Sequence, residues 1–269
     1  MIIDAHHHLR TTPGYLDKLK LTCEKLGIKK VCLFGGGKRS GDYGLGDNED
    51  VRKAMDEYPN LIIGFACFNL GEDPPEKIDE FIQEGFKGIK FIDPTKNYDA
   101  KDYYPVYQRI ESHGITALFH LGIVSRHPND KYYDVNNERH RPIYLDTIAR
   151  AFPNLMIIGA HLGNPWYEEA AMAARWNPNL YFDLSGSTLK CKSAKFLAEL
   201  LWWTPTTRYR DSQNRHAWEK IVFGSDVSAE EIADVLNDYK RVMTELNLSS
   251  EIQNKVLGGT ISKILLSEG

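Results

Sequence analysis

The sequence contains no run of apolar residues long enough to span a bilayer, and its first residues lack the charged-then-apolar layout of a secretory signal. It also lacks a basic excess, since 33 Lys and Arg residues are outnumbered by 37 Asp and Glu and the formal net charge is -4. Nucleic-acid-binding proteins usually carry a basic excess or stripe. We therefore expect a cytoplasmic protein that has neither a membrane nor a nucleic acid as its partner.

Cysteine is scarce and forms no recognisable motif. The four cysteines are far apart and include no CxxC pair. Cys32 and Cys67 lie inside apolar runs, where we expect them to be small core residues in a reducing compartment. A phosphate-binding loop is lacking as well, because the glycine-rich stretch FGGGKRSGDYGLG has no GK[ST] ending, and we expect a mobile loop there.

A regular series of short apolar runs is present instead. Each run is a few residues long, rich in Ile, Val, Leu and Phe, and nearly continuous rather than alternating, which is typical of strands buried on both faces. The eight runs are MIIDA from Met1, KKVCLFG from Lys29, NLIIGFACF from Asn60, GIKFI from Gly88, ITALFH from Ile115, NLMIIGAH from Asn154, NLYFDLS from Asn179 and KIVFGSD from Lys220. They predict the strands of a parallel sheet.

Charged, amphipathic stretches separate these runs and predict helices, for example over residues 75–86, 102–114, 143–154 and 228–247. Ser228 is the expected N-cap of the last of these helices. Eight strand–helix units favour a (β/α)8 barrel over a doubly wound open sheet, because no glycine fingerprint follows the first strand. We predict an α/β fold, a single-domain (β/α)8 TIM barrel over residues 1–269, with polar loops at 125–141 and 202–216.

Residues that bind metals or transfer protons follow several of the predicted strands. The strand ends carry His6, His7 and His8, then Lys90, His120, His161, Asp183 and Asp226. In a barrel of this kind, the carboxyl ends of the strands face the active site. We therefore expect these side chains to meet at one end of the barrel.

Four of these residues suit a divalent transition metal. Side chains at i and i+2 of a strand share a face, so His6 and His8 converge while His7 points elsewhere. With His120 and Asp226 they supply three imidazoles and one carboxylate, which is a set that zinc accepts. This set leaves room for a water molecule, whose pKa a bound metal lowers toward neutrality.

The motifs DAHHH, ALFHLG, IIGAHLGNPWYEEA, NLYFDLSG and IVFGSD occur in this order along nearly the whole chain. In them the sequence resembles the amidohydrolase superfamily, in the branch that holds metal-dependent hydrolases and aminocarboxymuconate-semialdehyde-type decarboxylases. The resemblance implies a TIM barrel of the metal-dependent hydrolase type. It also implies one divalent metal, Zn²⁺ or alternatively Mn²⁺, held by His6, His8, His120 and Asp226.

The resemblance further implies catalytic roles. His161 corresponds to the catalytic histidine beside the substrate, and Asp226 would move a proton as well as bind the metal. Lys90 occupies a position that carries a carboxylated lysine between two metals in some members, but a free amine that binds substrate charge in this branch. Homodimers are common in the family, so a homodimer is a further expectation.

The remaining polar residues receive simpler expectations. We expect Arg141 to pair with a substrate carboxylate and Trp166 to line the pocket or to pack in the barrel shell. Asp183 is expected to orient a ligand histidine. The other histidines fall on helix ends or loops and are expected to be solvated; they are His113, His127, His140 and His216.

These observations favour a hydrolase that attacks an ester, lactone or amide bond in a small, carboxylate-bearing substrate with metal-activated water. The alternative is a metal-dependent non-oxidative decarboxylase of an aromatic or muconate-like acid, which would use the same ligands. A non-catalytic metal-binding barrel is the third hypothesis. It would leave His161 and Asp226 without a task.

Overall fold

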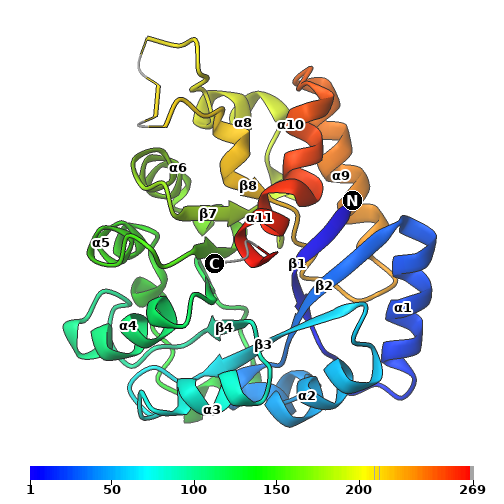
Figure 1. Ribbon diagram of the computed structural model, residues 1–269, viewed down its shortest axis with the longest axis vertical. Coiled ribbons are helices and arrows are strands. Elements are labelled where there is room, and N and C mark those ends of the chain that lie inside the picture. Colours follow the sequence, from blue (N-terminus) through cyan, green and yellow to red (C-terminus); the bar gives the residue numbers. More distant parts are fainter. Residues whose placement is uncertain (209, 212, 267–269) are drawn as a thin grey trace.

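Eight parallel strands form the inner layer of the protein. In the computed structural model, which describes residues 1–208, 210, 211 and 213–266, each strand pairs with the next along the chain (Figure 1). The strands are β1 (Ile2–His8), β2 (Ile28–Phe34), β3 (Ile62–Phe68), β4 (Gly88–Phe91), β5 (Thr116–Phe119), β6 (Ile157–Gly159), β7 (Leu180–Asp183) and β8 (Ile221–Val222). The Ala5 N–H donates to the Phe223 carbonyl at 2.9 Å, so the segment after β8 meets β1. The predicted TIM barrel is confirmed.

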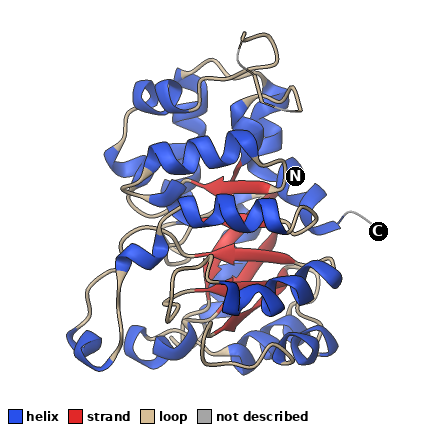
Figure 2. Ribbon diagram, turned by 90° about the vertical axis from the view of Figure 1, so that its left-hand side faces the viewer, coloured by secondary structure: helices blue, strands red, loops and turns tan. Residues whose placement is uncertain are grey.

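Helices surround the strands, as Figure 2 shows. They are α1 (Tyr15–Leu26), α2 (Asn48–Glu57), α3 (Lys77–Gln83), α4 (Tyr104–Ser112), α5 (Ile143–Ala151), α6 (Tyr167–Trp176), α7 (Thr188–Cys191), α8 (Ala194–Leu200), α9 (Ile232–Glu245), α10 (Ser250–Asn254) and α11 (Thr260–Leu266). The four helices expected from the amphipathic stretches correspond to α3, α4, α5 and α9. Ser228 is not the N-cap of α9, because this helix begins at Ile232 and the Ser228 hydroxyl donates to the Glu231 carboxylate at 2.8 Å in the turn before it.

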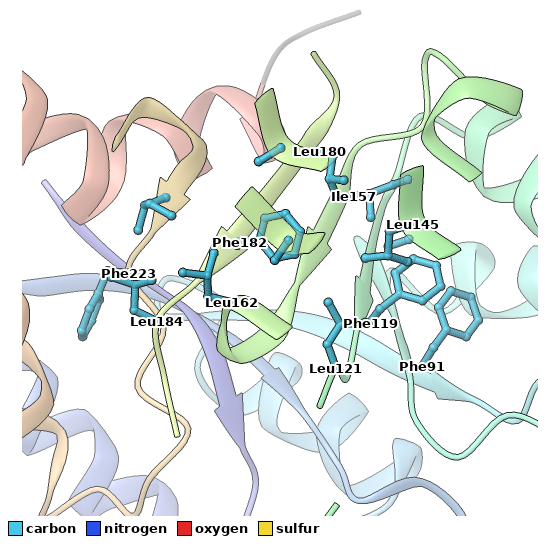
Figure 3. Close-up of a cluster of buried hydrophobic side chains, with 14 of the residues drawn as sticks. Phe91, Phe119, Leu121, Leu145, Ile157, Leu162, Leu180, Phe182, Leu184 and Phe223 are labelled. Atoms are coloured by element: carbon cyan, nitrogen blue, oxygen red, sulfur yellow. The ribbon is translucent and has the colours of Figure 1, made fainter. Parts of the chain in front are cut away.

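Each strand buries side chains on both of its faces. Leu118 of β5 and Ile158 of β6 belong to the cluster inside the barrel, whereas Phe119 and Ile157 belong to the larger core beneath the helices. Figure 3 shows part of that larger core, in which Phe119 lies beside Phe91 of β4, with 4.8 Å between their ring centroids. This burial on both faces explains why the strands are nearly continuous apolar runs.

The last helix covers the amino ends of the strands. Ile261 and Ile264 of α11 belong to the cluster inside the barrel, and α11 lies over the middle of the ring in Figure 1. Just before it, Gly258 lies so near the start of β1 that a Cβ atom would be 2.3 Å from the Met1 carbonyl oxygen. The carboxyl ends of the strands, where the candidate residues lie, are therefore at the opposite end of the barrel. No described helix has both the length and the apolar character needed to cross a bilayer.

Candidate metal centre

His6, His8 and Asp226 meet at the carboxyl end of the barrel. One potential ligand atom from each lies within 4.8 Å of the others. Nε2 of His6 and Nε2 of His8 are 3.5 Å and 3.6 Å from Oδ1 of Asp226. His7 is turned away from this group, and its ring contacts the Ser225 and Tyr15 hydroxyls. The alternation expected for β1 thus separates His7 from the group that could hold a metal ion.

Acceptor groups determine where the protons of His6 and His8 lie. Nδ1 of His6 is 2.8 Å from a carboxylate oxygen of Asp183, and Nδ1 of His8 is 2.7 Å from the Gly35 carbonyl oxygen. Both oxygens accept hydrogen bonds, so each neutral ring carries its proton on Nδ1 and has its electron pair on Nε2. Burial lowers the pKa of His8 to about 3, so this ring stays neutral at pH 7. Both Nε2 atoms therefore present electron pairs to the space beside Asp226.

His120 lies next to this group but outside the 4.8 Å cluster. Its ring centroid is 5.1 Å from that of His161 in an edge-on arrangement. Nε2 of His120 is buried and has no hydrogen-bond partner among the described residues. Buried nitrogen atoms of this kind are rarely left without a partner in folded proteins. This unpaired nitrogen fits a fourth ligand atom whose partner would be a cation.

His161 is held by the backbone and by Ser185. It begins a left-handed turn after β6, with φ values of 61° at His161 and 47° at Leu162. The His161 N–H donates to Asp183 at 2.9 Å, and the Ser185 hydroxyl donates to the same carboxylate oxygen at 2.5 Å. The Ser185 oxygen must then accept from Nδ1 of His161, which is 2.9 Å away. The electron pair of neutral His161 is therefore on Nε2, which is 3.7 Å from Asp226.

Asp226 follows β8 in a left-handed backbone conformation, with a φ of 48°. Its N–H donates to the His6 carbonyl at 2.8 Å, which fixes it to β1. Burial raises the pKa of the Asp226 carboxyl, but the neighbouring His6 and His161 outweigh this effect and the pKa is lower than usual. Asp226 is therefore ionised at neutral pH.

Lys90 brings a buried amine to the same place. Its side chain on β4 is 1% exposed, and Nζ is 3.4 Å from Nε2 of His6 and 4.7 Å from the centroid of the Phe34 ring. Burial lowers the pKa of Lys90 to about 8. A group with this pKa changes its charge more readily near neutral pH than an exposed lysine does.

Arg141 and Trp166 lie together, outside the two cavities that adjoin the histidine cluster. The Arg141 guanidinium is 2.9 Å from Glu138, forms a second ion pair with Glu169 and lies 5.7 Å from the centroid of the Trp166 ring. Neither residue lines the two cavities that adjoin the histidines. The structure thus brings these two predicted substrate residues to each other, and not to the other site residues.

The expectation that His140 is solvated is wrong. Its side chain is completely buried, with its ring centroid 5.4 Å from that of His120. Nε2 of His140 accepts a hydrogen bond from the Asp93 N–H at 3.2 Å. Burial is the main cause that lowers the pKa of His140 to about 4, and Arg39 and Arg139 add to the effect. His140 is thus part of the packing behind His120.

Two cavities adjoin the histidine cluster and share His120, Ser125 and Asp226 in their walls. The first, of about 250 Å³, is lined in addition by His8, Arg10, Gly36, Arg39, Tyr43, Leu45, Ile92, Val124 and Val227. The second, of about 360 Å³, is lined in addition by Leu121, Ile123, His161, Asn164, Pro165, Gly186 and Ser187. A further cavity of about 450 Å³ lies on the other side of Arg10, between α1 and α2, and contains none of the four expected ligands. Among these three cavities, only the first two are therefore lined by expected ligands.

Arg39 joins two loops over the first cavity. Its guanidinium is 2.8 Å from Asp93, which follows β4, and 2.9 Å from Asp130 in the loop after β5. It also lies 5.2 Å from the centroid of the Tyr43 ring, whose hydroxyl donates to the Ser125 carbonyl at 3.0 Å. The glycine-rich stretch thus lines the first cavity, and Arg39 connects it to the segments after β4 and β5.

Sequence reasoning did not identify Arg10, Arg39 or Ser185 as part of this centre. Two of the three follow from the strand period, because Arg10 lies two residues after His8 and Ser185 lies two residues after Asp183. The two-residue period that separated His6 and His8 from His7 could therefore also have identified these two residues. No comparable signal marks Arg39, which lies in an irregular loop.

Comparisons with known proteins agree with this fold. The family model of the amidohydrolases matches residues 3–265. Similar solved structures include an uncharacterized TIM-barrel protein from Bordetella bronchiseptica, with 17% identity, 98% of each chain covered and a TM-score of 0.68. A probable 2-pyrone-4,6-dicarboxylic acid hydrolase from Acinetobacter baumannii, crystallised with citric acid, has 13% identity, 98% of each chain covered and a TM-score of 0.65. The 5-carboxyvanillate decarboxylase from Sphingomonas paucimobilis also has 13% identity, 98% of each chain covered and a TM-score of 0.65.

At these identities the solved structures show the fold alone. No protein of curated function matches the sequence. The family model, in contrast, covers almost the entire chain. The protein belongs to the amidohydrolase family.

Proposed function

We propose that this protein is a metal-dependent hydrolase that cleaves an ester, lactone or amide bond in a small substrate bearing a carboxylate. The observation that carries the proposal is the convergence of His6, His8 and Asp226 within 4.8 Å, with both imidazole Nε2 electron pairs directed to the same space. The second support is His161, which lies beside Asp226 in the wall of an open cavity.

The donor set fits a divalent cation. His6, His8, His120 and Asp226 would hold one Zn²⁺ or Mn²⁺, and the unpaired buried Nε2 of His120 is the observation that this assignment explains best. When bound, such an ion supplies Lewis acidity and lowers the pKa of water toward neutrality. The amine of Lys90, beside His6, adds a positive charge that suits a substrate carboxylate.

The side chains then handle the proton. Asp226 is ionised at neutral pH and accepts the proton of the attacking water. Nε2 of His161 is 3.7 Å from the Asp226 carboxylate and carries an electron pair in the neutral ring, so it receives that proton next. The protonated ring can then stabilise the developing oxyanion through Nε2. The proton finally goes to the leaving group.

The test combines metal analysis with a substrate screen. Wild-type protein and Asp226→Asn are measured for bound Zn²⁺ and Mn²⁺ and for turnover of small carboxylated esters, lactones and amides. Asp56→Asn, at a side chain that is 73% exposed, is the matched control. We expect metal in the wild type and a loss of at least about 100-fold in kcat for Asp226→Asn only. Full activity of Asp226→Asn, or a wild type that binds metal without turning over any member of the screen, overturns the proposal.

Non-oxidative decarboxylation of an aromatic or muconate-like acid is the second candidate. Lys90 favours this reaction. Its buried amine next to His6 gives the centre a second positive group, which can bind the carboxylate that leaves as carbon dioxide. One similar fold is that of a named hydrolase and another that of a named decarboxylase, so the fold does not separate the two reactions. Release of carbon dioxide from carboxylated aromatics, without hydrolysis in the ester and lactone screen, would identify the decarboxylase.

A further inference from the structure

We propose that His7 is a positioning residue, which holds Asp226 in place through the Ser225 hydroxyl. It thereby sets the distance from the Asp226 carboxylate to the two imidazoles of the candidate metal centre. This inference rests on the proposed function and adds a residue to the machinery of that site. It concerns the face of β1 that points away from the metal centre, where the His7 side chain is completely buried.

The regular sheet does not hold Asp226 in place. β8 contains only Ile221 and Val222, and Asp226 lies four residues after Val222 with a left-handed φ of 48°. A backbone conformation of this kind costs about 1–3 kcal/mol and persists only where the surrounding structure holds it. The Asp226 N–H donates to the His6 carbonyl at 2.8 Å, which is one such contact. Contacts to the residue before Asp226 supply the others.

Asp4 of β1 holds Ser225, which directly precedes Asp226. The Asp4 side chain is completely buried, and one of its carboxylate oxygens accepts from the N–H groups of His6 at 3.1 Å and of Ser225 at 2.9 Å. The other oxygen accepts from the Ser225 hydroxyl at 2.5 Å. That hydroxyl has one proton, and the His6 carbonyl oxygen is farther away, at 3.4 Å. The proton of Ser225 therefore goes to Asp4, and the Ser225 oxygen is left as an acceptor.

His7 supplies the donor for this oxygen. Nδ1 of His7 is 2.9 Å from the Ser225 oxygen, so the proton of the neutral ring lies on Nδ1. Its Nε2 then accepts from the hydroxyl of Tyr15, on α1, at 2.8 Å. His7 and Ser225 are both completely buried, so loss of the imidazole leaves the Ser225 oxygen without its donor. His7 thus connects α1 to the turn that carries Asp226.

The bond between His7 and Ser225 joins the two segments that carry the candidate ligands. His7 lies between His6 and His8 in β1, and both of these imidazoles are already oriented through their Nδ1 atoms. The Asp226 carboxylate lies 3.5 Å and 3.6 Å from their Nε2 atoms, and its position depends on the turn at Ser225. Zinc binds nitrogen and oxygen ligands at about 2.0–2.2 Å, so a displaced carboxylate would bind a shared ion less tightly.

Two amide variants separate this role from simple packing. In His7→Asn, the side-chain nitrogen takes roughly the place of Nδ1 and can still donate to Ser225. In His7→Gln, the side-chain amide takes roughly the place of Nε2 and reaches Tyr15 instead. Both variants remove the imidazole ring, so a role in packing alone predicts similar effects. His113→Gln is the matched control, because it removes an imidazole that is partly exposed and pairs with Asp79 on α3.

The first measurement does not depend on turnover or on a bound ion. Hydrogen exchange of the Ser225 and Asp226 amides is followed by NMR in the full chain, with and without Zn²⁺. We expect both amides to exchange roughly 10- to 100-fold faster in His7→Gln, because the hydrogen bond that steadies the turn is lost. His7→Asn and His113→Gln should stay within about threefold of the wild type. Nitrogen-15 NMR should show the proton of His7 on Nδ1 in the wild type.

The second measurement is the affinity for Zn²⁺, determined by competition with a chromophoric chelator. We expect it to fall by about 10- to 100-fold in His7→Gln and to stay near the wild-type value in His7→Asn and His113→Gln. If His7→Gln does not fold, as judged by its circular dichroism spectrum, Tyr15→Phe takes its place and should speed exchange of the same two amides. Tyr58→Phe is its control, because the Tyr58 hydroxyl also bonds to α1, through Asp17 at 2.6 Å.

Three results would overturn the inference. They are unchanged amide exchange in His7→Gln, equal losses in His7→Asn and His7→Gln, and a wild-type His7 ring with its proton on Nε2. Failure of the proposed function gives a different result. A wild type that binds no metal contradicts the proposed function, while exchange without Zn²⁺ still decides whether His7 holds the turn. Metal binding and hydrolysis in the wild type, combined with unchanged exchange in His7→Gln, contradict the inference alone.

Discussion

The Ser185 hydroxyl donates a hydrogen bond to Asp183 at 2.5 Å and thereby determines which nitrogen of His161 carries the proton. The same carboxylate accepts from Nδ1 of His6 through its other oxygen at 2.8 Å. One buried acid thus orients a candidate metal ligand directly and a candidate catalytic base through Ser185. Groups that orient ligands in this way commonly affect metal affinity or activity by about 10- to 100-fold.

Removal of the Ser185 hydroxyl should affect the chemical step and leave substrate binding unchanged. In Ser185→Ala, Nδ1 of His161 loses its acceptor and the ring can turn or exchange tautomers. We expect kcat to fall by about 10- to 100-fold with an unchanged KM, and Ser185→Thr to restore most of the activity. Nitrogen-15 NMR of the imidazole should show Nδ1–H in the wild type and a mixture of tautomers in Ser185→Ala. A wild-type spectrum with the proton on Nε2 would contradict the assignment.

Replacement of Asp183 should weaken the metal site. Asp183→Asn keeps the shape of the side chain but removes the charge that makes Nε2 of His6 a better ligand. We expect the affinity for Zn²⁺, measured by competition with a chromophoric chelator, to fall by about 10- to 100-fold. The exposed Asp56→Asn provides the control for a general effect of charge. An unchanged affinity in a folded Asp183→Asn would show that this carboxylate does not act on the metal ligands.

Acid should destabilise the protein through His140. The pKa of His140 is about 4 in the folded protein, compared with 6.5 for a histidine in an unfolded chain, so the unfolded state binds the additional proton first. The contribution of His140 to stability is complete above pH 6.5 and is lost as the pH falls toward 4. Between about pH 7 and about pH 4.5 this loss amounts to about 2 kcal/mol. Urea unfolding of the wild type and of His140→Gln across this range should give a smaller pH dependence for the variant.

Two glycines with similar backbone angles should tolerate alanine differently. Gly122 has a φ of 89°, and a Cβ there would lie 1.9 Å from the Asn164 carbonyl oxygen, whereas Gly27 has a φ of 74° and no atom within 4 Å of its Cβ position. Gly27→Ala should lower the free energy of unfolding only by the cost of placing an alanine in the left-handed conformation, about 1–2 kcal/mol. Gly122→Ala adds a backbone collision beside His161 and should cost at least about 2 kcal/mol more, as measured by urea unfolding. Equal losses would mean that the Asn164 segment moves freely.

The barrel and the arrangement of the metal-ligand candidates follow from local patterns. Apolar runs mark the strands because both strand faces are buried, and the two-residue strand period separates His6 and His8 from His7. The carboxyl ends of parallel strands share one end of a barrel, so residues as distant in sequence as His6 and Asp226 could be placed together from the sequence. These inferences need only strand direction and side-chain period.

The tertiary structure decided which of the loop residues reach the site. Arg141 and His140 are neighbours in the chain, yet Arg141 pairs with Glu169 on α6 while His140 is buried behind His120. Arg10 lines the first cavity without a carboxylate partner among the described residues, whereas the charge of Arg39 is matched by two aspartates from other loops. Loops have no fixed period, and their paths depend on contacts with distant segments. For this reason the strand ends could be predicted from the sequence, while the partners of the loop residues Arg39, His140 and Arg141 required the folded protein.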